Sequence, residues 1–391
     1  MTGPRPELVE GRRPEPVEGP LAGIRILEIG HMLAGPYGGL LLADLGADVV
    51  KIEPPSGDIA RRVGPHSLGP HNLYFASLNR NKRSVVIDLA TETGQGELHR
   101  LCRGAHALLV NLRPSAIKKL GLTYEALKSV NPRLVCVALT GFGLDSPFAE
   151  RPAYDYVIQA MTGIMELTGD PGTPPTKTGY SAVDNSAGIM AALGLLAKIV
   201  EGKGGQVDIA MSDVMLSQLN YLASASLNAG EKSRRYAGSA HPWIVPAQTF
   251  RTRDGWLALF ITHDEFWRRF CTEIGRPQWI RKEAFATMAA RNANREEVVE
   301  RIAAVIAERD TKEWVRRLAP VGVVVAGVET LEDALASEQA AARSMVVEIP
   351  VEGGILRAVG NPIKVDREES RYAPPPLLGE HDGILIEEGA R

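Results

Sequence analysis

Asp184 is the residue whose surroundings most favour chemistry. It precedes the run AGIMAALGLLAKIV (187–200), which is rich in helix formers and ends before the breaker GKGG (202–205). The pattern predicts a helix of roughly 14 to 18 residues with Asp184 at its N-cap or in its first turn. There the helix dipole and the free N–H groups favour the ionised carboxylate. An aspartate that only caps a helix, without a catalytic role, would occupy the same position.

The segment before Asp184 favours a functional carboxylate over a simple cap. TGDPGTPPTKTGYSAV (168–183) contains two clusters of proline and glycine, which predict an irregular loop. This loop would present the carboxylate at the end of a helix whose small residues, among them Gly188 and Ala192, let a neighbour pack closely. Such a carboxylate can act as a base or as a nucleophile, and the pattern does not choose between them.

The elements that must position Asp184 follow an α/β pattern. Short apolar segments alternate with helical ones and lie at 24–29, 48–55, 85–89, 106–111 and 134–139. A strand, a glycine loop, a helix and a strand within about thirty residues form a βαβ unit, which implies a parallel sheet. We therefore expect an open, doubly wound (Rossmann-like) sheet that binds ligands at the carboxyl ends of its strands.

The loop GHMLAGPYGG (30–39) after the first strand lacks the G-x-G-x-x-G fingerprint of dinucleotide sites. Glu53 resembles the acid that binds a ribose in such sites, but without the fingerprint an NAD-dependent dehydrogenase is disfavoured. His31 in this loop is either a scaffold histidine or a ligand contact. The basic residues within 80–83 and 113–119 suit a phosphorylated ligand or an ordinary solvated surface.

The rest of the chain predicts a second, smaller α/β domain, with a hairpin turn at Asp254-Gly255. Residues 5–19 contain a near-duplicated Pro/Glu/Gly repeat that cannot bury a core. The expected organisation is a disordered extension (1–20), a large ligand-binding domain (21–205) with a C-terminal return (345–391), a linker helix and connection (206–239), and a small domain (240–344).

Composition disfavours several functional classes. The 391 residues carry a net charge of −3, which gives no general attraction to nucleic acid or to an anionic membrane. The cysteines Cys102, Cys136 and Cys271 are far apart and in no metal-ligand spacing, so we expect no metal site and a reduced, cytoplasmic location. We read no apolar run that approaches the length of a membrane span.

Taken together, these segments resemble the class III CoA-transferases (CaiB/BaiF type), a group that includes formyl-CoA, carnitine and bile-acid CoA-transferases and the α-methylacyl-CoA racemases. The resemblance covers nearly everything from Leu21 to about Glu388. It rests on LAGIRILEIGHMLAGPYGGLLLADLGADVVKIEPPSGD, LNRNKRSVVIDL, NLRPSAIKKLGL, YEALKSVNPRLV, PAYDYVIQAMTGIMELTG, the Asp184 stretch, GKGGQVDIAMSD and PLLGEHD.

The resemblance implies an enzyme whose two chains are threaded through one another as interlocked rings. In this homodimer the acid site would lie between the large domain of one chain and the small domain of the other. Asp184 matches the family nucleophile, which attacks an acyl-CoA thioester to give a mixed anhydride and then becomes an aspartyl-CoA thioester. The partners would be an acyl-CoA and a free carboxylic acid, with the CoA thioester as substrate and no cofactor.

The resemblance also implies which residues bind CoA. Pro54 and Pro152 stand where the family often has basic residues, so phosphate contacts are expected from Arg61, Arg62, Lys82 or Arg83. Matching CoA positions are His31, Leu33, Ala34, Ile87, Asp88, Leu89, Asn111, Leu112, Arg113, Lys119, Tyr154 and Asp155. Gly238 and His241 would line the acid site.

One position distinguishes the branches of the family. The racemases use a histidine where this chain has Tyr154, and a tyrosine with a pKa near 10 is a poor second base at neutral pH. We therefore expect a transferase that moves CoA from succinyl-CoA to a small carboxylic or dicarboxylic acid, whose second carboxylate could pair with Arg234, Arg235 or His241. The alternatives are a 2-methylacyl-CoA racemase that uses Asp184 as a base, and a non-catalytic CoA-binding dimer.

Overall fold

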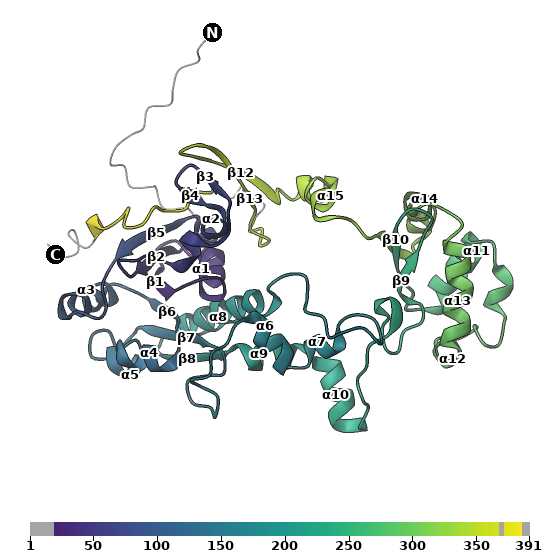
Figure 1. Ribbon diagram of the computed structural model, residues 1–391, viewed down its shortest axis with the longest axis horizontal. Helices are drawn as coiled ribbons and strands as arrows, with labels where there is room; N and C mark the ends of the chain where they lie inside the picture. Colours follow the sequence, from purple (N-terminus) through teal and green to yellow (C-terminus); the bar gives the residue numbers. More distant parts are fainter. Residues whose placement is uncertain (1–18, 367–370, 385–391) are drawn as a thin grey trace, which may run out of the picture. The chain divides into compact units, whose positions relative to one another are not determined.

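The computed structural model describes residues 19–366 and 371–384, which form two compact units (Figure 1). The described parts of Met1–Thr162, Gly179–Asn220 and Gln339–Arg391 make unit 1, and Gly163–Thr178 with Tyr221–Glu338 make unit 2. These boundaries differ from the predicted ones, because 206–220 belong to unit 1 and 163–178 to unit 2. Most of the predicted N-terminal extension lies outside the described residues.

Unit 1 is built on one six-stranded sheet in the order β5-β2-β1-β6-β7-β8, and every pairing is parallel. This is the doubly wound order, which reverses between β1 and β6. The α/β fold class is therefore confirmed. The strands are β1 (Arg25–Gly30), β2 (Asp48–Glu53), β5 (Lys82–Val86), β6 (Ala107–Asn111), β7 (Val135–Thr140) and β8 (Gly205–Ala210).

Two of these strands correct the sequence prediction. The third strand in sequence order was expected at 85–89. The observed strand β5 instead spans Lys82–Val86, so Leu89 lies outside it. Residues 206–228 read in the sequence as a strand that runs into a helix. This strand is β8, but it pairs with β7 from Val135↔Gly205 to Thr140↔Ala210 and so belongs to the sheet and not to the linker (206–239). A strand that joins an edge after a long intervening helix cannot be assigned to a sheet from local pattern alone.

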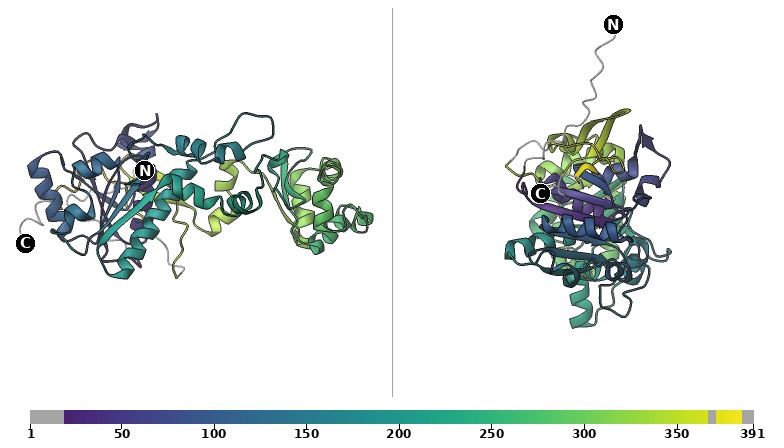
Figure 2. Two further views of the ribbon diagram at one scale, coloured as in Figure 1. Left: turned by 90° about the horizontal axis from the view of Figure 1, so that it is seen from below. Right: turned by 90° about the vertical axis from the view of Figure 1, so that its left-hand side faces the viewer.

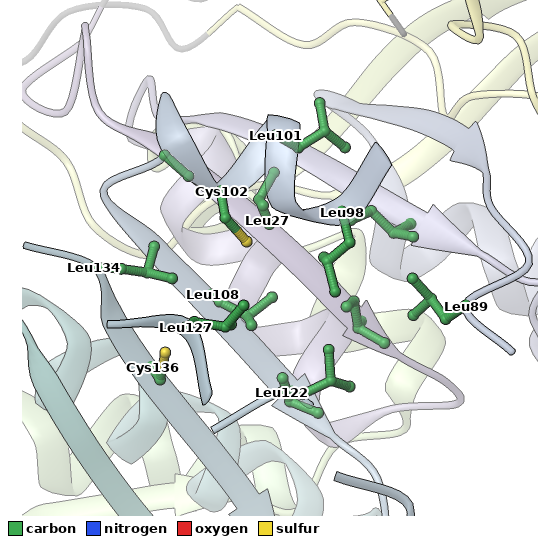
Figure 3. Packing of buried hydrophobic residues seen from close by; sticks show 14 of the residues in the cluster. Leu27, Leu89, Leu98, Leu101, Cys102, Leu108, Leu122, Leu127, Leu134 and Cys136 are labelled. Carbon is green, nitrogen blue, oxygen red and sulfur yellow. The ribbon is translucent and has the colours of Figure 1, made fainter. Parts of the chain in front are cut away.

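Helices cover both faces of this sheet (Figures 1 and 2). One face packs against α3 (Glu92–Arg103), α4 (Pro114–Lys119) and α5 (Tyr124–Leu127). Leu98 and Leu101 of α3 meet Leu27 and Leu108 of the strands there, and Leu127 closes the same cluster (Figure 3). The central strands are buried along almost their whole length, because α1 (Ala34–Asp44) and α8 (Ala182–Glu201) pack on the other face.

α1 and α8 approach each other at two glycines, as the small residues predicted. A Cβ added to Gly38 would lie 2.6 Å from the Gly188 carbonyl oxygen, and one added to Gly188 would lie 2.5 Å from the Ala34 carbonyl oxygen. Both distances are below any real Cβ contact, so the crossing requires glycine at both positions.

α8 is longer and more apolar than predicted. It has 20 residues, and a stretch of 18 of them has a mean hydropathy of 1.4, so by length and composition it is the one helix of the described residues that could cross a membrane. Its contacts with α1, β7 and β8 place it against the sheet of unit 1. The expectation that no apolar run reaches this length was therefore wrong, because small residues such as Ala187 and Ala191 give a packed helix the same hydropathy.

The other elements of unit 1 lie outside the six-stranded sheet. β12 and β13 form a hairpin whose second strand the sequence did not predict. Residues 345–366 of the predicted C-terminal return are described within unit 1, although 367–370 and 385–391 lie outside the described residues. These elements are η1 (Ile59–Arg62), β3 (Ser67–Leu68), β4 (His71–Asn72), α2 (Leu73–Asn79), α6 (Asp155–Met161), α9 (Met211–Gln218), β12 (Val346–Val351) and β13 (Gly354–Val359).

Unit 2 combines a three-stranded antiparallel sheet with helices around Trp267, Phe270 and Trp314. The predicted hairpin is confirmed: β9 and β10 pair from Ala247↔Phe260 to Arg251↔Trp256 around the expected turn. The elements are α7 (Ile164–Leu167), α10 (Asn220–Ala229), η2 (Ala237–Ser239), β9 (Ala247–Arg251), β10 (Trp256–Phe260), α11 (Asp264–Glu273), η3 (Pro277–Ile280), α12 (Met288–Ala293), α13 (Arg295–Ile306), α14 (Thr311–Leu318), η4 (Ala319–Val321), β11 (Val324–Gly327) and α15 (Leu331–Leu335), followed by α16 (Glu338–Ala342) at the boundary.

Candidate active site

The pocket around Asp184 lies in unit 1, beside the strand ends at the point where the strand order reverses. His31 directly follows β1 and Leu112 directly follows β6, and both line a cavity of about 110 Å³. Ligand sites of doubly wound sheets form at this point, because the connections leave the two neighbouring strand ends in opposite directions. The lining residues are His31, Met32, Leu33, Ala34, Tyr74, Asn111, Leu112, Arg113, Pro114, Thr140, Gly141, Ala149, Arg151, Ala153, Tyr154, Asp184 and Met211.

Asp184 lies in the first turn of α8, as predicted, and another carboxylate caps this helix. Ser181 at the N-cap position makes no side-chain cap bond. Instead the buried carboxylate of Asp155 accepts hydrogen bonds from the backbone N–H of Val183 at 2.8 Å and of Asp184 at 3.5 Å. Gln159 also donates to Asp155, at 2.7 Å. Asp155 therefore fixes the start of the helix that presents Asp184.

The expectation that the helix dipole keeps Asp184 ionised is not supported by the structure. Burial raises the pKa of Asp184 to about 7, and the charge of Asp155 adds to this effect. A helix N-terminus typically favours a carboxylate by only about 0.3–1 kcal/mol, which is less than the effect of burial here. Asp184 therefore loses its proton near neutral pH and becomes a stronger nucleophile or base than an ordinary aspartate when ionised.

The loop after β1 forms one wall of the pocket and contains His31, Leu33 and Ala34. Burial lowers the pKa of His31; the charge of Asp58 opposes this, and Lys51 and Arg113 add to the lowering. His31 is therefore neutral near pH 7. The predicted contact Asn111 holds this wall from the next strand, because its side chain accepts from Gly35 N–H at 3.3 Å and donates to the Leu139 carbonyl at 3.0 Å.

Arg113 and Arg151 are the cationic side chains that line this pocket among the described residues. Four other cations were expected to contact the CoA phosphates, because Pro54 and Pro152 stand where the family often has basic residues. All four have other partners. Arg61 pairs with Glu53, Lys82 with Glu28 and Arg83 with Asp48, while Arg62 donates to the Ser56 carbonyl. The pairing of Glu53 with Arg61 also removes the ribose-binding acid of the dinucleotide alternative.

Five of the predicted CoA contacts do not line the pocket: Ile87, Asp88, Leu89, Lys119 and Asp155. Ile87 and Leu89 are side chains of the hydrophobic core, and Asp88 accepts from Ala90 N–H in a turn. Lys119 is exposed at the end of α4.

Sequence reasoning missed Arg151, Tyr74 and Thr140. Arg151 immediately precedes Pro152, so a search one residue either side of the expected basic position would have found it. Tyr74 gave no signal, but it lines the same pocket as Asp184, and burial and then the charge of Asp184 raise the pKa of its hydroxyl.

His241 lines a second, larger cavity of about 650 Å³ that lies entirely in unit 2. Its walls include Tyr221, Trp243 and Phe260, whose rings lie 5.7, 6.1 and 6.3 Å from the His241 ring. His241 Nδ1 accepts from the backbone N–H of residues 243 and 244, which leaves its proton on Nε2. Burial lowers the pKa of His241, and Arg295 adds to this effect.

The other predicted acid-site residues lie around this cavity but not all within it. Gly238 has φ +65° and its N–H donates to Asp170 Oδ1 at 2.8 Å, so it shapes the neighbouring loop without lining the cavity. Arg234 lines the cavity. Arg235 instead donates to the carbonyls of Thr173 and its neighbours and holds the loop 170–174.

The chain belongs to the CoA-transferase family III, whose model matches residues 21–382. The succinate–glutarate CoA-transferase of Agrobacterium fabrum is 36% identical over 390 residues, covering 94% of this chain and 95% of that protein. The acetyl-CoA:oxalate CoA-transferase of Acetobacter aceti is 32% identical, covering 96% and 97%. A crystal structure of a CAIB/BAIF family protein from Brucella suis superposes with a TM-score of 0.82 at 33% identity, covering 95% and 99%. The resemblance predicted from the motifs is confirmed, and with it the prediction of a CoA-transferase.

Proposed function

We propose that this chain moves CoA from an acyl-CoA donor to a free carboxylic acid through covalent intermediates on Asp184, and that the donor is succinyl-CoA. The observation that carries the proposal is the half-buried carboxylate of Asp184, which lines a pocket at the strand ends together with the cations Arg113 and Arg151. These guanidinium groups suit the phosphates of CoA, and the thioester would then reach Asp184.

The reaction would proceed in four exchanges. A carboxylate oxygen of Asp184 attacks the thioester carbonyl, the CoA thiolate leaves, and a mixed anhydride forms. The thiolate attacks the aspartyl carbonyl of this anhydride, which releases the donor acid and leaves an aspartyl-CoA thioester. The acceptor carboxylate attacks that thioester and displaces the thiolate. The thiolate then attacks the acceptor carbonyl of the second anhydride and restores Asp184.

The cavity of unit 2 is our candidate for binding the acceptor acid. The Nε2–H of His241 can donate to a carboxylate oxygen, and Arg234 supplies a cation. This pairing supports a dicarboxylic acceptor, whose non-reacting carboxylate would lie against Arg234.

The contribution of Arg234 can be measured by exchange kinetics with two acceptors of the same chain length, a dicarboxylic acid and a monocarboxylic acid. Arg234→Met should raise KM for a dicarboxylate roughly three- to fivefold, as expected for an exposed ion pair, and leave KM for the monocarboxylate unchanged. Lys232→Met is the matched control, because Lys232 is an exposed cation outside the cavity lining. Equal changes for both acids would contradict this assignment.

The covalent step is tested by offering a panel of acyl-CoA donors and free acids and following CoA exchange by mass spectrometry. Hydroxylamine should trap a hydroxamate at Asp184, and Asp184→Ala should reduce exchange by roughly 10⁴-fold or more. Asp145→Ala, at an exposed loop position, should retain exchange. Full exchange by a folded Asp184→Ala variant would overturn the mechanism.

The racemase alternative has one observation in its favour, because a carboxyl with a pKa of about 7 also suits a general base. It predicts exchange of the α-hydrogen of a 2-methylacyl-CoA with deuterium from solvent and no CoA exchange. Tyr154, which stands at the position of the second base, is 59% exposed. An open position of this kind does not favour a tuned catalytic base.

We also propose a homodimer of interlocked chains. Ile189, Leu193 and Val200 form an outward apolar stripe on α8 and are 46%, 59% and 86% exposed. Apolar residues that recur along one helix face in this way mark a contact surface. Interlocked chains cannot separate while folded, so sedimentation at nanomolar concentration should show only dimer, and a folded monomer would contradict interlocking.

A further inference from the structure

Beneath the CoA pocket lies a set of four buried charges that the mechanism above does not use. Glu28, Lys51, Lys82 and Asp58 balance in charge, and the ion-paired side chains of all four are fully buried. Glu28 is shared between the two lysines: its Oε1 lies 2.9 Å from Lys51 Nζ and its Oε2 lies 2.7 Å from Lys82 Nζ. Removing either lysine therefore takes the same charge from the same carboxylate.

The two lysines differ in what else they contact. Lys51 Nζ also donates to the Gly30 carbonyl at 3.1 Å and pairs with Asp58 Oδ2 at 3.0 Å. Lys82 Nζ instead donates to the Pro36 carbonyl and the Asn79 side chain. Of the two lysines, Lys51 alone contacts both the Gly30 carbonyl, at the start of the turn 30–32, and Asp58, which holds the end of that turn.

Asp58 completes the connection to that turn. Its Oδ1 accepts from Met32 N–H at 3.2 Å and from Ala60 N–H at 2.9 Å. Met32 has φ +63°, a left-handed conformation that is unfavourable for any residue with a side chain. Such a conformation persists only where surrounding contacts hold it. Burial lowers the pKa of Lys51, but the charges of Glu28 and Asp58 outweigh this effect and raise it above its ordinary value, so Lys51 remains a cation.

We propose that Lys51, acting through Asp58, is a positioning residue that holds the strained turn 30–32 in the conformation that binds CoA. Lys51 fixes the Gly30 carbonyl, Asp58 fixes the Met32 N–H, and His31 is held between them at the pocket wall. The proposal rests on the assignment of this pocket to CoA. It means that the shape of the pocket depends on two residues, Lys51 and Asp58, that do not line it.

The test compares Lys51→Met with Lys82→Met in the full-length protein. Both variants remove one buried cation from Glu28, so both should lower Tm. Lys51→Met alone should weaken the binding of coenzyme A, measured by calorimetry, on the order of tenfold, as expected when a charge-assisted hydrogen-bond network at one turn is lost. It should also speed hydrogen exchange of the Met32 amide on the order of tenfold, whereas Lys82→Met should leave both quantities near wild type.

Equal weakening of coenzyme A binding by the two variants, or unchanged binding in Lys51→Met, would overturn the proposal. If Lys51→Met does not fold, Asp58→Ala and Asp58→Asn decide the matter. The alanine removes the acceptor for Met32 N–H and should weaken binding, while the asparagine keeps an acceptor oxygen and should bind more tightly than the alanine variant. Equal affinities would refute the positioning role. Failure of the wild-type protein to bind coenzyme A would instead refute the proposed function, and Met32 exchange would still report whether Lys51 holds the turn.

Discussion

Replacing Asp184 by asparagine should stabilise the protein, and the gain should depend on pH. The pKa of Asp184 is about 7 in the folded chain, against an ordinary value of 3.8. At about 1.4 kcal/mol per pKa unit, the ionised form costs the folded state at most about 4 kcal/mol. Asparagine has nearly the same shape and no charge, so we expect a gain of about 2–4 kcal/mol in the free energy of unfolding at pH 8.

The direction of this pH dependence follows from the number of protons that the folded and unfolded states bind. Between pH 3.8 and about 7 the folded state binds more protons than the unfolded state, so wild-type stability falls as pH rises and levels off above about 7. The advantage of Asp184→Asn should therefore be small near pH 4, grow steadily through pH 5 and 6, and stay constant above about pH 7. Urea unfolding at matched protein concentration measures it through the midpoint and the slope.

Asp145→Asn is the matched control, because it removes the same charge from an exposed loop residue. Its effect on stability should stay within about 0.5 kcal/mol at every pH. A constant difference between wild type and Asp184→Asn from pH 5 to pH 8.5, or destabilisation at pH 8, would show that burial does not raise this pKa. The loss of activity in the same variant, together with higher stability, would mark Asp184 as a site where function opposes stability.

Three further predictions follow from single contacts. Gly188→Ala should cost about 1–3 kcal/mol of stability by chemical denaturation, because its Cβ would lie 2.5 Å from a carbonyl oxygen; an unchanged midpoint would contradict the crossing of α1 and α8. Asp155→Asn should move the acid limb of kcat/KM, expected near pH 7, to lower pH, because it removes a charge that raises the pKa of Asp184. Arg151→Gln should weaken coenzyme A binding by calorimetry and reduce its dependence on salt, whereas Arg62→Gln, outside the pocket lining, should change neither.

The sequence by itself determined the local features. A helix-forming run after an irregular loop placed Asp184 in the first turn of α8, and the small residues of that run predicted a close helix crossing. Asp254-Gly255 predicted the hairpin of unit 2, because a two-residue turn depends on its own residue types. The strand and helix alternation also sufficed for a parallel sheet with its pocket at the strand ends.

Only the tertiary structure decided which charges are available and what their protonation is. Arg61 and Lys82 look like phosphate ligands in the sequence, but each has a carboxylate partner brought beside it by the fold. Asp155 lies 29 residues before Asp184 and caps its helix. Burial, together with the charge of Asp155, raises the pKa of Asp184, which the helix dipole alone would lower. Helix capping and turn geometry are local, whereas burial and ion pairing depend on distances in space that no spacing along the chain records.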